Sequence, residues 1–284
     1  MYLINTICVC GAGTMGSGIA QVAAMAGYTT IQFDVNEEML VKSKMGIEKN
    51  LLWLFEKGKI NSEQQIQCLE RIRFTNNLSD CVADLIIEAI IETKEAKSAL
   101  FNQLSDINSS NSIFASNTSS ISITEIASSI PNPERVVGMH FFNPAPVMKL
   151  VELVKTVLTD TKTLDAVVAL TIKMDKTPVI CKDAPGFIVN RVARHYYLEA
   201  MKLVEQGFAT IETVDAIMEA TGFKMGPFKL MDLIGIDINF SVSKIVWDAL
   251  GRPERLMPSP LQKQKIESGE LGRKTGKGFY SYDS

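Results

Sequence analysis

Up to about residue 180, the chain alternates short apolar runs with longer stretches that repeat apolar residues at helical spacing. The apolar runs have the length of buried strands and predict strands at residues 4–10, 29–34, 71–75, 84–89, 112–116, 136–141, 149–154 and 177–181. The stretches between them predict helices at residues 14–26, 36–57, 94–104, 124–128 and 164–174. Strands that alternate with helices are typical of a parallel, doubly wound α/β sheet.

The pattern changes at residues 182–186, where a proline and a glycine interrupt it. Later stretches have helical periodicity, and no clear strand follows; the predicted helices are residues 187–205, 211–221, 227–233 and 239–250. We therefore expect two domains, an α/β domain over residues 1–184 and an all-α domain over residues 185–284.

The composition is that of an ordinary globular protein. Apolar residues make up 46% and charged residues 21% of the 284 residues, and the formal net charge is −3. Because there is no basic excess, we expect no nucleic-acid partner. No apolar run reaches the roughly 20 residues that a membrane-spanning helix needs. The most apolar stretch, residues 85–91, is interrupted by Glu88, so we expect no membrane partner either.

The cysteines and the N-terminus indicate a cytoplasmic protein. The five cysteines are odd in number and form no C-x-x-C pair; they are Cys8, Cys10, Cys68, Cys81 and Cys181. The first residues show neither a positively charged region nor a small-residue cleavage site. We expect reduced cysteines, with no disulfide and no metal site.

A glycine motif follows the first predicted strand and opens the first predicted helix. It reads Gly11-Ala12-Gly13-Thr14-Met15-Gly16, which is G-x-G-x-x-G. In this context the first glycine permits a tight turn, the second lets a pyrophosphate approach the backbone, and the third lets the helix pack on the strand. The helix N-terminus offers unpaired N–H groups to the phosphates. The motif predicts a Rossmann-type dinucleotide site, whereas a simple strand-to-helix turn is the alternative.

Asp34 lies at the end of the second predicted strand, eighteen residues after Gly16. A carboxylate at this place accepts hydrogen bonds from ribose hydroxyls and repels a 2′-phosphate. The sequence therefore favours NAD over NADP as the cofactor.

Two histidines are available as the base that alcohol oxidation requires. His195 lies in the middle of a predicted helix, where a structural role is expected. His140 ends a predicted strand, and ligands of parallel sheets bind beyond the carboxyl ends of strands. Glu152 lies within an apolar strand, where a buried carboxylate needs a partner. If these strands are antiparallel neighbours, Glu152 faces His140; a histidine buried in the core is the alternative.

Five motifs together resemble the L-3-hydroxyacyl-CoA dehydrogenases, and most closely the short bacterial 3-hydroxybutyryl-CoA dehydrogenases. They are the glycine motif, Ser116-Asn117-Thr118-Ser119-Ser120, Met139-His140-Phe141-Phe142-Asn143-Pro144, Val147-Met148-Lys149-Leu150-Val151-Glu152 and Asp183-Ala184-Pro185-Gly186-Phe187-Ile188-Val189-Asn190-Arg191. The resemblance extends over essentially the whole chain. It implies an NAD-binding domain followed by a helical domain similar to the C-terminal domain of 6-phosphogluconate dehydrogenase.

The resemblance also implies roles for individual residues. His140 looks like the catalytic base and Glu152 like its partner. Ser119 looks like the hydroxyl that binds the C3 oxygen of the substrate near the nicotinamide, and Asn190 like a substrate-orienting amide. Read alone, Ser119 is equally a helix cap, and Asn190 an exposed polar residue of a helix.

Further positions match the cofactor side and the CoA side of the family. Glu92, Lys97, Asn143 and Lys277 match cofactor-side positions, and each is equally explained as a solvated polar residue. Asn50 and Lys57 match positions that bind CoA. The helix around them departs from the family, because Trp53 and Glu56 stand where lysines are common. Trp53 could stack on adenine, but a buried or partner-facing tryptophan is the commoner case.

The resemblance implies reversible oxidation of a 3-hydroxyacyl-CoA by NAD, with the substrate in the cleft between the domains. It also implies a homodimer formed through the helical domain. Two alternatives remain open. One is a dehydrogenase of a free hydroxy acid, as in the L-gulonate dehydrogenase and λ-crystallin branch. The other is an NAD-binding protein without catalytic activity.

Overall fold

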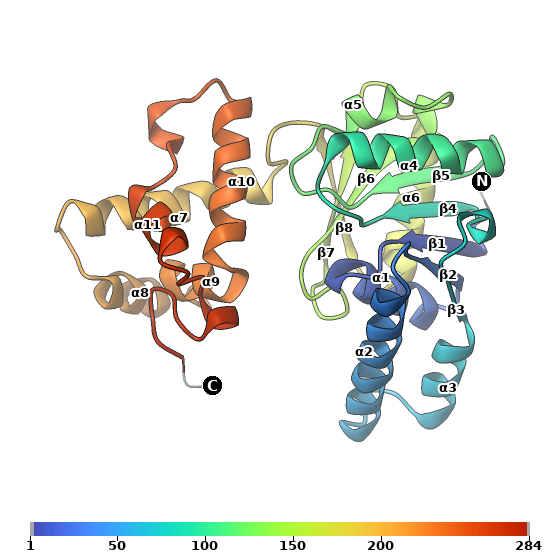
Figure 1. Ribbon diagram of the computed structural model, residues 1–284, viewed down its shortest axis with the longest axis horizontal. Helices are drawn as coiled ribbons and strands as arrows, with labels where there is room; N and C mark the ends of the chain where they lie inside the picture. Colours follow the sequence, from blue (N-terminus) through green and yellow to red (C-terminus); the bar gives the residue numbers. More distant parts are fainter. Residues whose placement is uncertain (1–2, 283–284) are drawn as a thin grey trace. The chain divides into compact units, whose positions relative to one another are not determined.

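The computed structural model describes residues 3–282. The chain divides into two compact units, Met1–Asp183 and Ala184–Ser284 (Figure 1). Residues 1–2 of the first expected domain and residues 283–284 of the second lie outside the described residues.

The first unit is built on an eight-stranded sheet in the order β3-β2-β1-β4-β5-β6-β7-β8. Its strands are β1 (Thr6–Cys10), β2 (Thr29–Phe33), β3 (Ile72–Thr75), β4 (Leu85–Glu88), β5 (Ile113–Ser116), β6 (Val136–Phe141), β7 (Leu150–Lys155) and β8 (Thr177–Lys182). Strands β4, β5 and β6 are buried along their whole length, as expected of parallel strands covered on both faces.

The sheet departs from an all-parallel arrangement at one edge, in the way that the pairing of Glu152 with His140 requires. Strands β1 to β6 are parallel, but β7 is antiparallel to β6, and β8 is parallel to β7. Residues 142–149, which connect β6 to β7, are fewer than the dozen or so that a parallel crossover needs, so the chain turns back as a hairpin. The prediction of a doubly wound parallel sheet is therefore confirmed for six of the eight strands.

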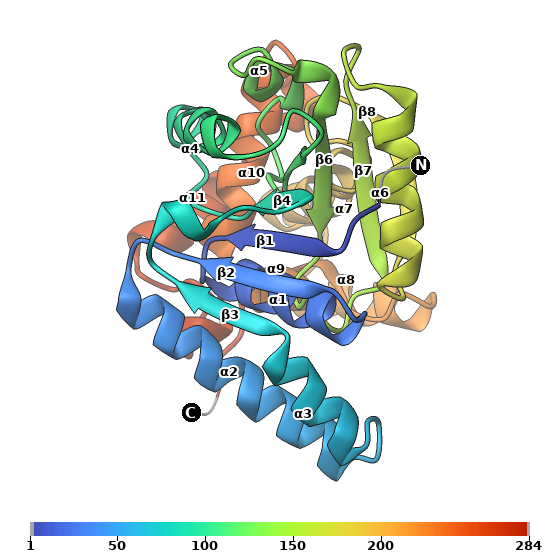
Figure 2. The same ribbon diagram turned by 90° about the vertical axis from the view of Figure 1, so that its right-hand side faces the viewer.

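Helices cover both faces of this sheet, as Figures 1 and 2 show. They are α1 (Thr14–Met25), α2 (Glu37–Glu56), α3 (Ser62–Glu70), α4 (Lys94–Ile107), α5 (Ile123–Ala127) and α6 (Thr161–Lys173). Helices α1 and α6 share one apolar cluster with the sheet, to which Ile19, Val167 and Leu170 belong. On α4, Phe101 packs edge-on against Phe114 of β5, with ring centroids 5.3 Å apart. The carboxyl ends of the parallel strands, where the site residues cluster, are thus held by a continuous core.

The second unit is helical in the described residues. Its helices are α7 (Val189–Glu205), α8 (Ile211–Ala220), α9 (Pro227–Ile234), α10 (Ile236–Ala249) and α11 (Pro260–Glu267). They enclose a separate core that includes Met201, Phe228 and Met231. No helix among the described residues of the chain is long and apolar enough to cross a membrane.

Candidate active site

The three glycines of the first turn are glycines for different reasons. Gly11 has a φ of +110°, and a Cβ there would lie 2.4 Å from Ala89 O. A Cβ on Gly16 would lie 1.9 Å from Gly11 O, so only glycine lets α1 approach β1 this closely. Gly13 has an ordinary φ of −71°, and a Cβ there would meet no atom within 4 Å. The fold therefore requires glycine at 11 and 16 but not at 13.

The residues of this turn fit a dinucleotide. The space beside Gly13 opens into a cavity and lets a bound group reach the backbone, which explains a glycine that the fold does not need. Gly13 caps α1 without a side-chain hydrogen bond, so the first turn of the helix keeps N–H groups for a phosphate. Thr14, exposed, and Met15, half-buried, begin that turn.

Polar side chains beneath the turn hold it in place. Ser17 Oγ donates to Ser43 Oγ at 2.7 Å, and Ser43 Oγ donates to Gln32 Oε1 at 2.7 Å. Gln32 Nε2 lies 3.4 Å from Gly11 O. Gln32 is fully buried, and Ser43 is 3% exposed. This chain of hydrogen bonds joins α1, α2 and β2 directly behind the glycine turn.

Asp34 follows β2 and fastens the same turn. Its Oδ2 accepts from Ala12 N at 2.7 Å, and its Oδ1 accepts from Asn36 N at 2.9 Å. Each carboxylate oxygen has a second lone pair, so the half-buried Asp34 retains the capacity to accept from ribose hydroxyls.

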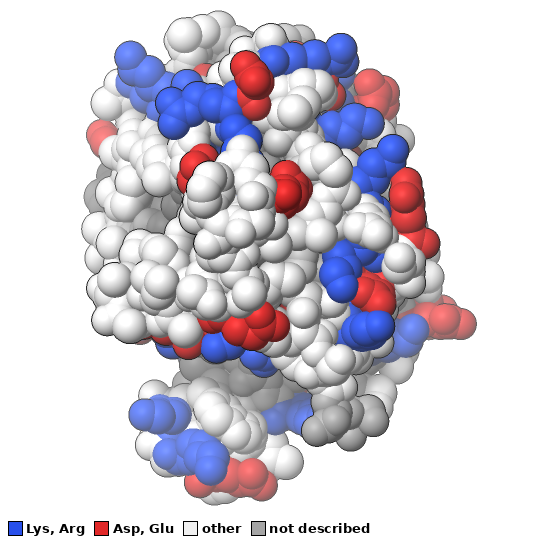
Figure 3. Space-filling model, turned by 90° about the vertical axis from the view of Figure 1, so that its left-hand side faces the viewer, with Lys and Arg blue, Asp and Glu red and all other residues white. Residues whose placement is uncertain are grey.

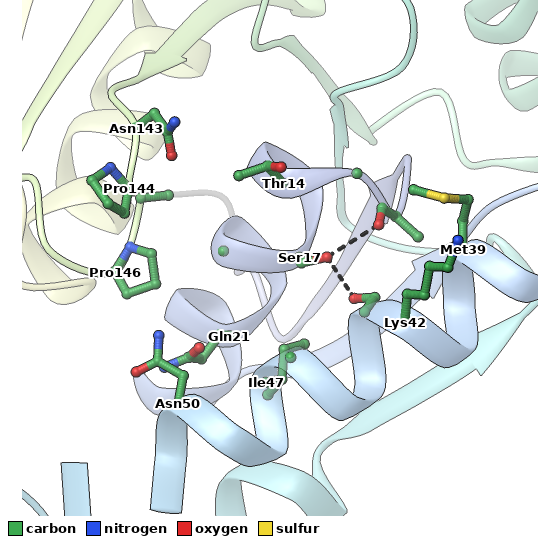
Figure 4. Close-up of a pocket in the computed structure, with 16 residues that line it drawn as sticks. Thr14, Ser17, Gln21, Met39, Lys42, Ile47, Asn50, Asn143, Pro144 and Pro146 are labelled. Atoms are coloured by element: carbon green, nitrogen blue, oxygen red, sulfur yellow. Dashed lines mark hydrogen bonds between the residues drawn. The ribbon is translucent and has the colours of Figure 1, made fainter. Parts of the chain in front are cut away.

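A cavity of about 360 Å³ lies between α1, α2 and the segment after β6 (Figure 4). Asn50 of α2 and Asn143 lie on its wall, so the structure brings a predicted CoA-side residue and a predicted cofactor-side residue to one cavity. Lys42 is also on the wall. Lys57, two turns beyond Asn50, is exposed and does not line the cavity.

His140 and Glu152 face each other across β6 and β7. The two residues are paired in the antiparallel register, and Nδ1 of His140 lies 2.7 Å from Oε2 of Glu152. His140 is 6% exposed and Glu152 is fully buried. An ionised carboxylate only accepts, so Nδ1 carries the hydrogen and Nε2 is the basic nitrogen. His195, by contrast, is an exposed residue of α7.

Ser119 lies in a segment that a glutamate organises. Oε1 of Glu92 accepts from Thr118 Oγ1 at 2.5 Å, from Ser119 N at 3.0 Å and from Ser120 Oγ at 3.0 Å. Burial acts to raise the pKa of Glu92, but the charge of Lys97 and the hydrogen bonds outweigh it and leave the pKa below its usual value. Glu92 is therefore ionised at neutral pH and holds the backbone on either side of Ser119.

Lys97 does not have the surroundings of a solvated lysine. Its side chain is only 1% exposed, and its Nζ lies 2.6 Å from Glu88 and 3.1 Å from Glu92. The solvated alternative is wrong for Lys97. Asn143 is exposed.

Asn190 and Lys277 belong to the second unit. Asn190 is half-buried in the first turn of α7. Lys277 is exposed and pairs with Glu270 at 2.5 Å.

The side chain of Trp53, on α2, is not buried, because Trp53 is 51% exposed; the buried alternative for this residue is wrong. Glu56 ends the same helix and is exposed.

The sequence pattern did not single out Glu88 and Asn117 as part of the site. Glu88 is fully buried at the end of β4, and its Oε2 accepts from Ser116 Oγ at 2.6 Å. Asn117 Oδ1 accepts from Phe141 N, next to His140, at 2.8 Å. The signal for Glu88 was available, since an acid within an apolar strand needs a partner, as for Glu152. Asn117 gave no such signal.

Comparison with known proteins gives the family of both units. Residues 6–184 match the model of the 3-hydroxyacyl-CoA dehydrogenase NAD binding domain, and residues 186–282 match the model of the C-terminal domain of the same enzymes. The probable 3-hydroxybutyryl-CoA dehydrogenase of Deinococcus radiodurans is 42% identical over 96% of this chain and 99% of its own length.

Two further relatives support this result. The 3-hydroxyadipyl-CoA dehydrogenase of Escherichia coli is 44% identical over 99% of this chain, which spans only 60% of the length of that protein. The crystal structure of (S)-3-hydroxybutyryl-CoA dehydrogenase from Ralstonia eutropha superposes with a TM-score of 0.95 at 36% identity, covering 99% of this chain and 100% of the other. The chain therefore belongs to the 3-hydroxyacyl-CoA dehydrogenase family of oxidoreductases, and its first unit is the NAD-binding domain of that family.

Proposed function

We propose that the protein catalyses the reversible oxidation of an (S)-3-hydroxyacyl-CoA to the 3-oxoacyl-CoA with NAD, and that 3-hydroxybutyryl-CoA and acetoacetyl-CoA are its substrate pair. The observation that carries this proposal is the contact between His140 and Glu152, 2.7 Å long and buried at the end of β6. Names of relatives that include 3-hydroxybutyryl-CoA support the short acyl chain.

In the oxidation, His140 takes the proton of the C3 hydroxyl on Nε2. The glycine turn and Asp34 would hold NAD, which would supply the acceptor for the hydride of C3. In the reverse direction the same nitrogen returns the proton to the carbonyl oxygen. The reaction needs a group that changes its charge near neutral pH, which imidazole does.

Glu152 makes His140 suitable for this task in two ways. Its carboxylate holds the hydrogen on Nδ1 and so presents Nε2 to the substrate. It also stabilises the positive charge that the ring gains with the proton, and this interaction is strong because the pair is buried.

Ser119 and Asn190 complete the proposed substrate contacts. The hydroxyl of Ser119 binds the C3 oxygen, and the amide of Asn190 orients the acyl thioester. The N–H of Ser119 and the hydroxyls of Thr118 and Ser120 all donate to Glu92, and this fixed segment supports the role of Ser119.

We assign the cofactor and the CoA moiety to different parts of the first unit. The glycine turn and Asp34 hold NAD, with Glu92, Lys97, Asn143 and Lys277 as further cofactor-side residues. The cavity beside Gly13 extends to Asn50 and Lys42, and we assign this part of it to CoA, with Lys57 as a cation for the CoA phosphates.

We also propose that the protein is a cytoplasmic homodimer. Its cysteines are all free, which suits a reducing compartment. Figure 3 displays a face of the helical unit with a broad uncharged area, bordered mainly by charged side chains. Exposed apolar residues of this unit include Val192, Leu233 and Ile238. Such a surface supports association with a second copy.

The proposal is tested by following NADH oxidation with acetoacetyl-CoA, with free acetoacetate, and with NADPH in place of NADH. Turnover that needs both the CoA ester and NADH is the expected result, and it would show that Trp53 and Glu56 are compatible with CoA binding. Turnover of the free acid would instead favour a dehydrogenase of free hydroxy acids. Absence of turnover with every substrate, while NADH still binds, would favour a protein without catalytic activity.

A further inference from the structure

Two carboxylates and one lysine form a cluster between β4 and α4. Nζ of Lys97 lies 2.6 Å from Oε1 of Glu88 and 3.1 Å from Oε2 of Glu92. Glu88 is fully buried and Lys97 is 1% exposed, whereas the side chain of Glu92 is 37% exposed. Lys97 therefore joins an acid of the core to an acid at the surface.

Both acids also hold the segment after β5. Glu92 accepts from Ser119 N and from the hydroxyls of Thr118 and Ser120. Glu88 accepts from Ser116 Oγ, and Ser116 Oγ in turn accepts from Thr118 N at 3.2 Å. Residues 116–120 are thus fixed at both ends through carboxylates that share one cation.

The position of each carboxylate in this cluster depends on the charge of Lys97 between them. Two carboxylates close to one cation leave a net negative charge, and a buried charge that loses its partner costs several kcal/mol. Removal of Lys97 would leave Glu88 and Glu92 to repel each other, and Glu92 would no longer be drawn toward β4. The acceptor that fixes Ser119 N would then shift.

We propose that Glu88 and Lys97 are positioning residues of the active site. They do not touch the substrate; they hold the carboxylate of Glu92 where it places the Ser119 hydroxyl for the reacting oxygen. This inference rests on the function proposed above for Ser119.

The test separates positioning from stability. Lys97→Met replaces the lysine with an uncharged chain of similar shape but leaves two uncompensated carboxylates, so the protein loses stability. Glu88→Gln combined with Lys97→Met leaves a single carboxylate, Glu92, and restores much of the melting temperature. Lys94→Met is the matched control, because Lys94 is on the same helix and its Nζ pairs with exposed Glu125 at 2.9 Å, away from the cluster.

In the double variant we expect kcat to fall about 10-fold or more, because small displacements at a reacting centre are costly, while KM for acetoacetyl-CoA changes by less than about 2-fold. The same double change made in a Ser119→Ala background should cause little further loss, since both changes act through one hydroxyl. Lys94→Met should leave both constants unchanged. Full kcat in a stable double variant, or a further loss that adds to that of Ser119→Ala, would overturn the proposal.

Hydrogen exchange provides a readout that does not depend on turnover. The amide of Ser119 donates to Glu92 and should exchange slowly in the unchanged protein and at least about 10-fold faster in the double variant. If the unchanged protein binds NADH but turns over no CoA ester, the proposed function fails, and the exchange rates alone then decide whether Glu88 and Lys97 hold this segment. Equal exchange in both proteins would refute the positioning role.

Discussion

At the scale of single residues, two glycines three positions apart give opposite predictions. Gly13→Ala should leave the fold intact or stabilise it by about 0.4–1 kcal/mol, because φ at this position suits alanine and the Cβ meets no protein atom. The same Cβ occupies the space through which a pyrophosphate approaches, so we expect the affinity for NADH to fall at least about 10-fold. Thermal unfolding and fluorescence titration with NADH measure the two effects.

Gly16→Ala is the matched comparison, because its Cβ would lie 1.9 Å from Gly11 O within the fold. We expect it to lose about 3 kcal/mol or more of unfolding free energy. An unchanged NADH affinity in a folded Gly13→Ala variant would show that the dinucleotide does not approach this backbone.

Glu152→Gln tests the proposed base at the same scale. Glutamine keeps the shape of the side chain but removes the charge that stabilises the protonated His140 ring. We expect kcat to fall about 10²- to 10⁴-fold while NADH binds as before, because the glycine turn is unaffected. Stopped-flow turnover and NADH titration of the purified variant check this, and unchanged turnover would remove Glu152 from the mechanism.

At the scale of elements, a buried carboxylate joins two helices of the helical unit. Asp215 of α8 is fully buried, and its two oxygens accept from Phe228 N at 2.9 Å and Lys229 N at 3.0 Å, in the first turn of α9. Oδ2 also accepts from the Tyr280 hydroxyl at 2.9 Å. The carboxylate thus satisfies the N-terminus of one helix from the middle of another.

Asp215→Asn should therefore destabilise the protein by about 1–3 kcal/mol, because an amide has one accepting oxygen for these donors and no charge for the helix N-terminus. NADH affinity should stay unchanged, since the glycine turn belongs to the first unit. Chemical denaturation followed by circular dichroism gives the stability. If the variant unfolds at the same denaturant concentration, the capping role of Asp215 is wrong.

The elements that sequence periodicity predicted are those with an apolar face, and the ones it missed lack such a face. Helix α3 buries only Cys68, and α11 buries only Gln262, so neither repeats apolar residues at helical spacing. Helix α3 is instead closed by a capping box between Asn61 and Gln64. The alternation of strands and helices alone does not give the direction of β7; the short connection of residues 142–149 does.

The candidate site was predictable to the extent that burial constrained it. An acid in an apolar strand needs a partner, and this argument led from Glu152 to His140. The same argument applied to Glu88 and was not made, so the buried pair of Glu88 and Lys97 appeared only in the structure. Asn117 acts through a backbone N–H of a neighbouring strand, which no spacing along the chain can reveal.

At the scale of the whole molecule, the apolar surface of the helical unit bears on association. Leu233 and Ile234 end α9 and Ile238 lies in the first turn of α10; they are 49%, 38% and 50% exposed. Three exposed apolar residues within six positions form a patch of the kind that subunit interfaces bury. The NAD-binding turn is in the other unit, so association and cofactor binding can be measured separately.

We therefore expect the protein to have twice the chain mass in light scattering, and Ile238→Glu to shift it to the monomer, because a carboxylate in the middle of this patch would have to be desolvated. Phe208→Glu is the control: Phe208 is 76% exposed in the turn after α7, away from the patch in sequence. NADH affinity should be the same in both variants. If Phe208→Glu dissociates the protein and Ile238→Glu does not, the interface includes the turn after α7 instead of the junction of α9 and α10.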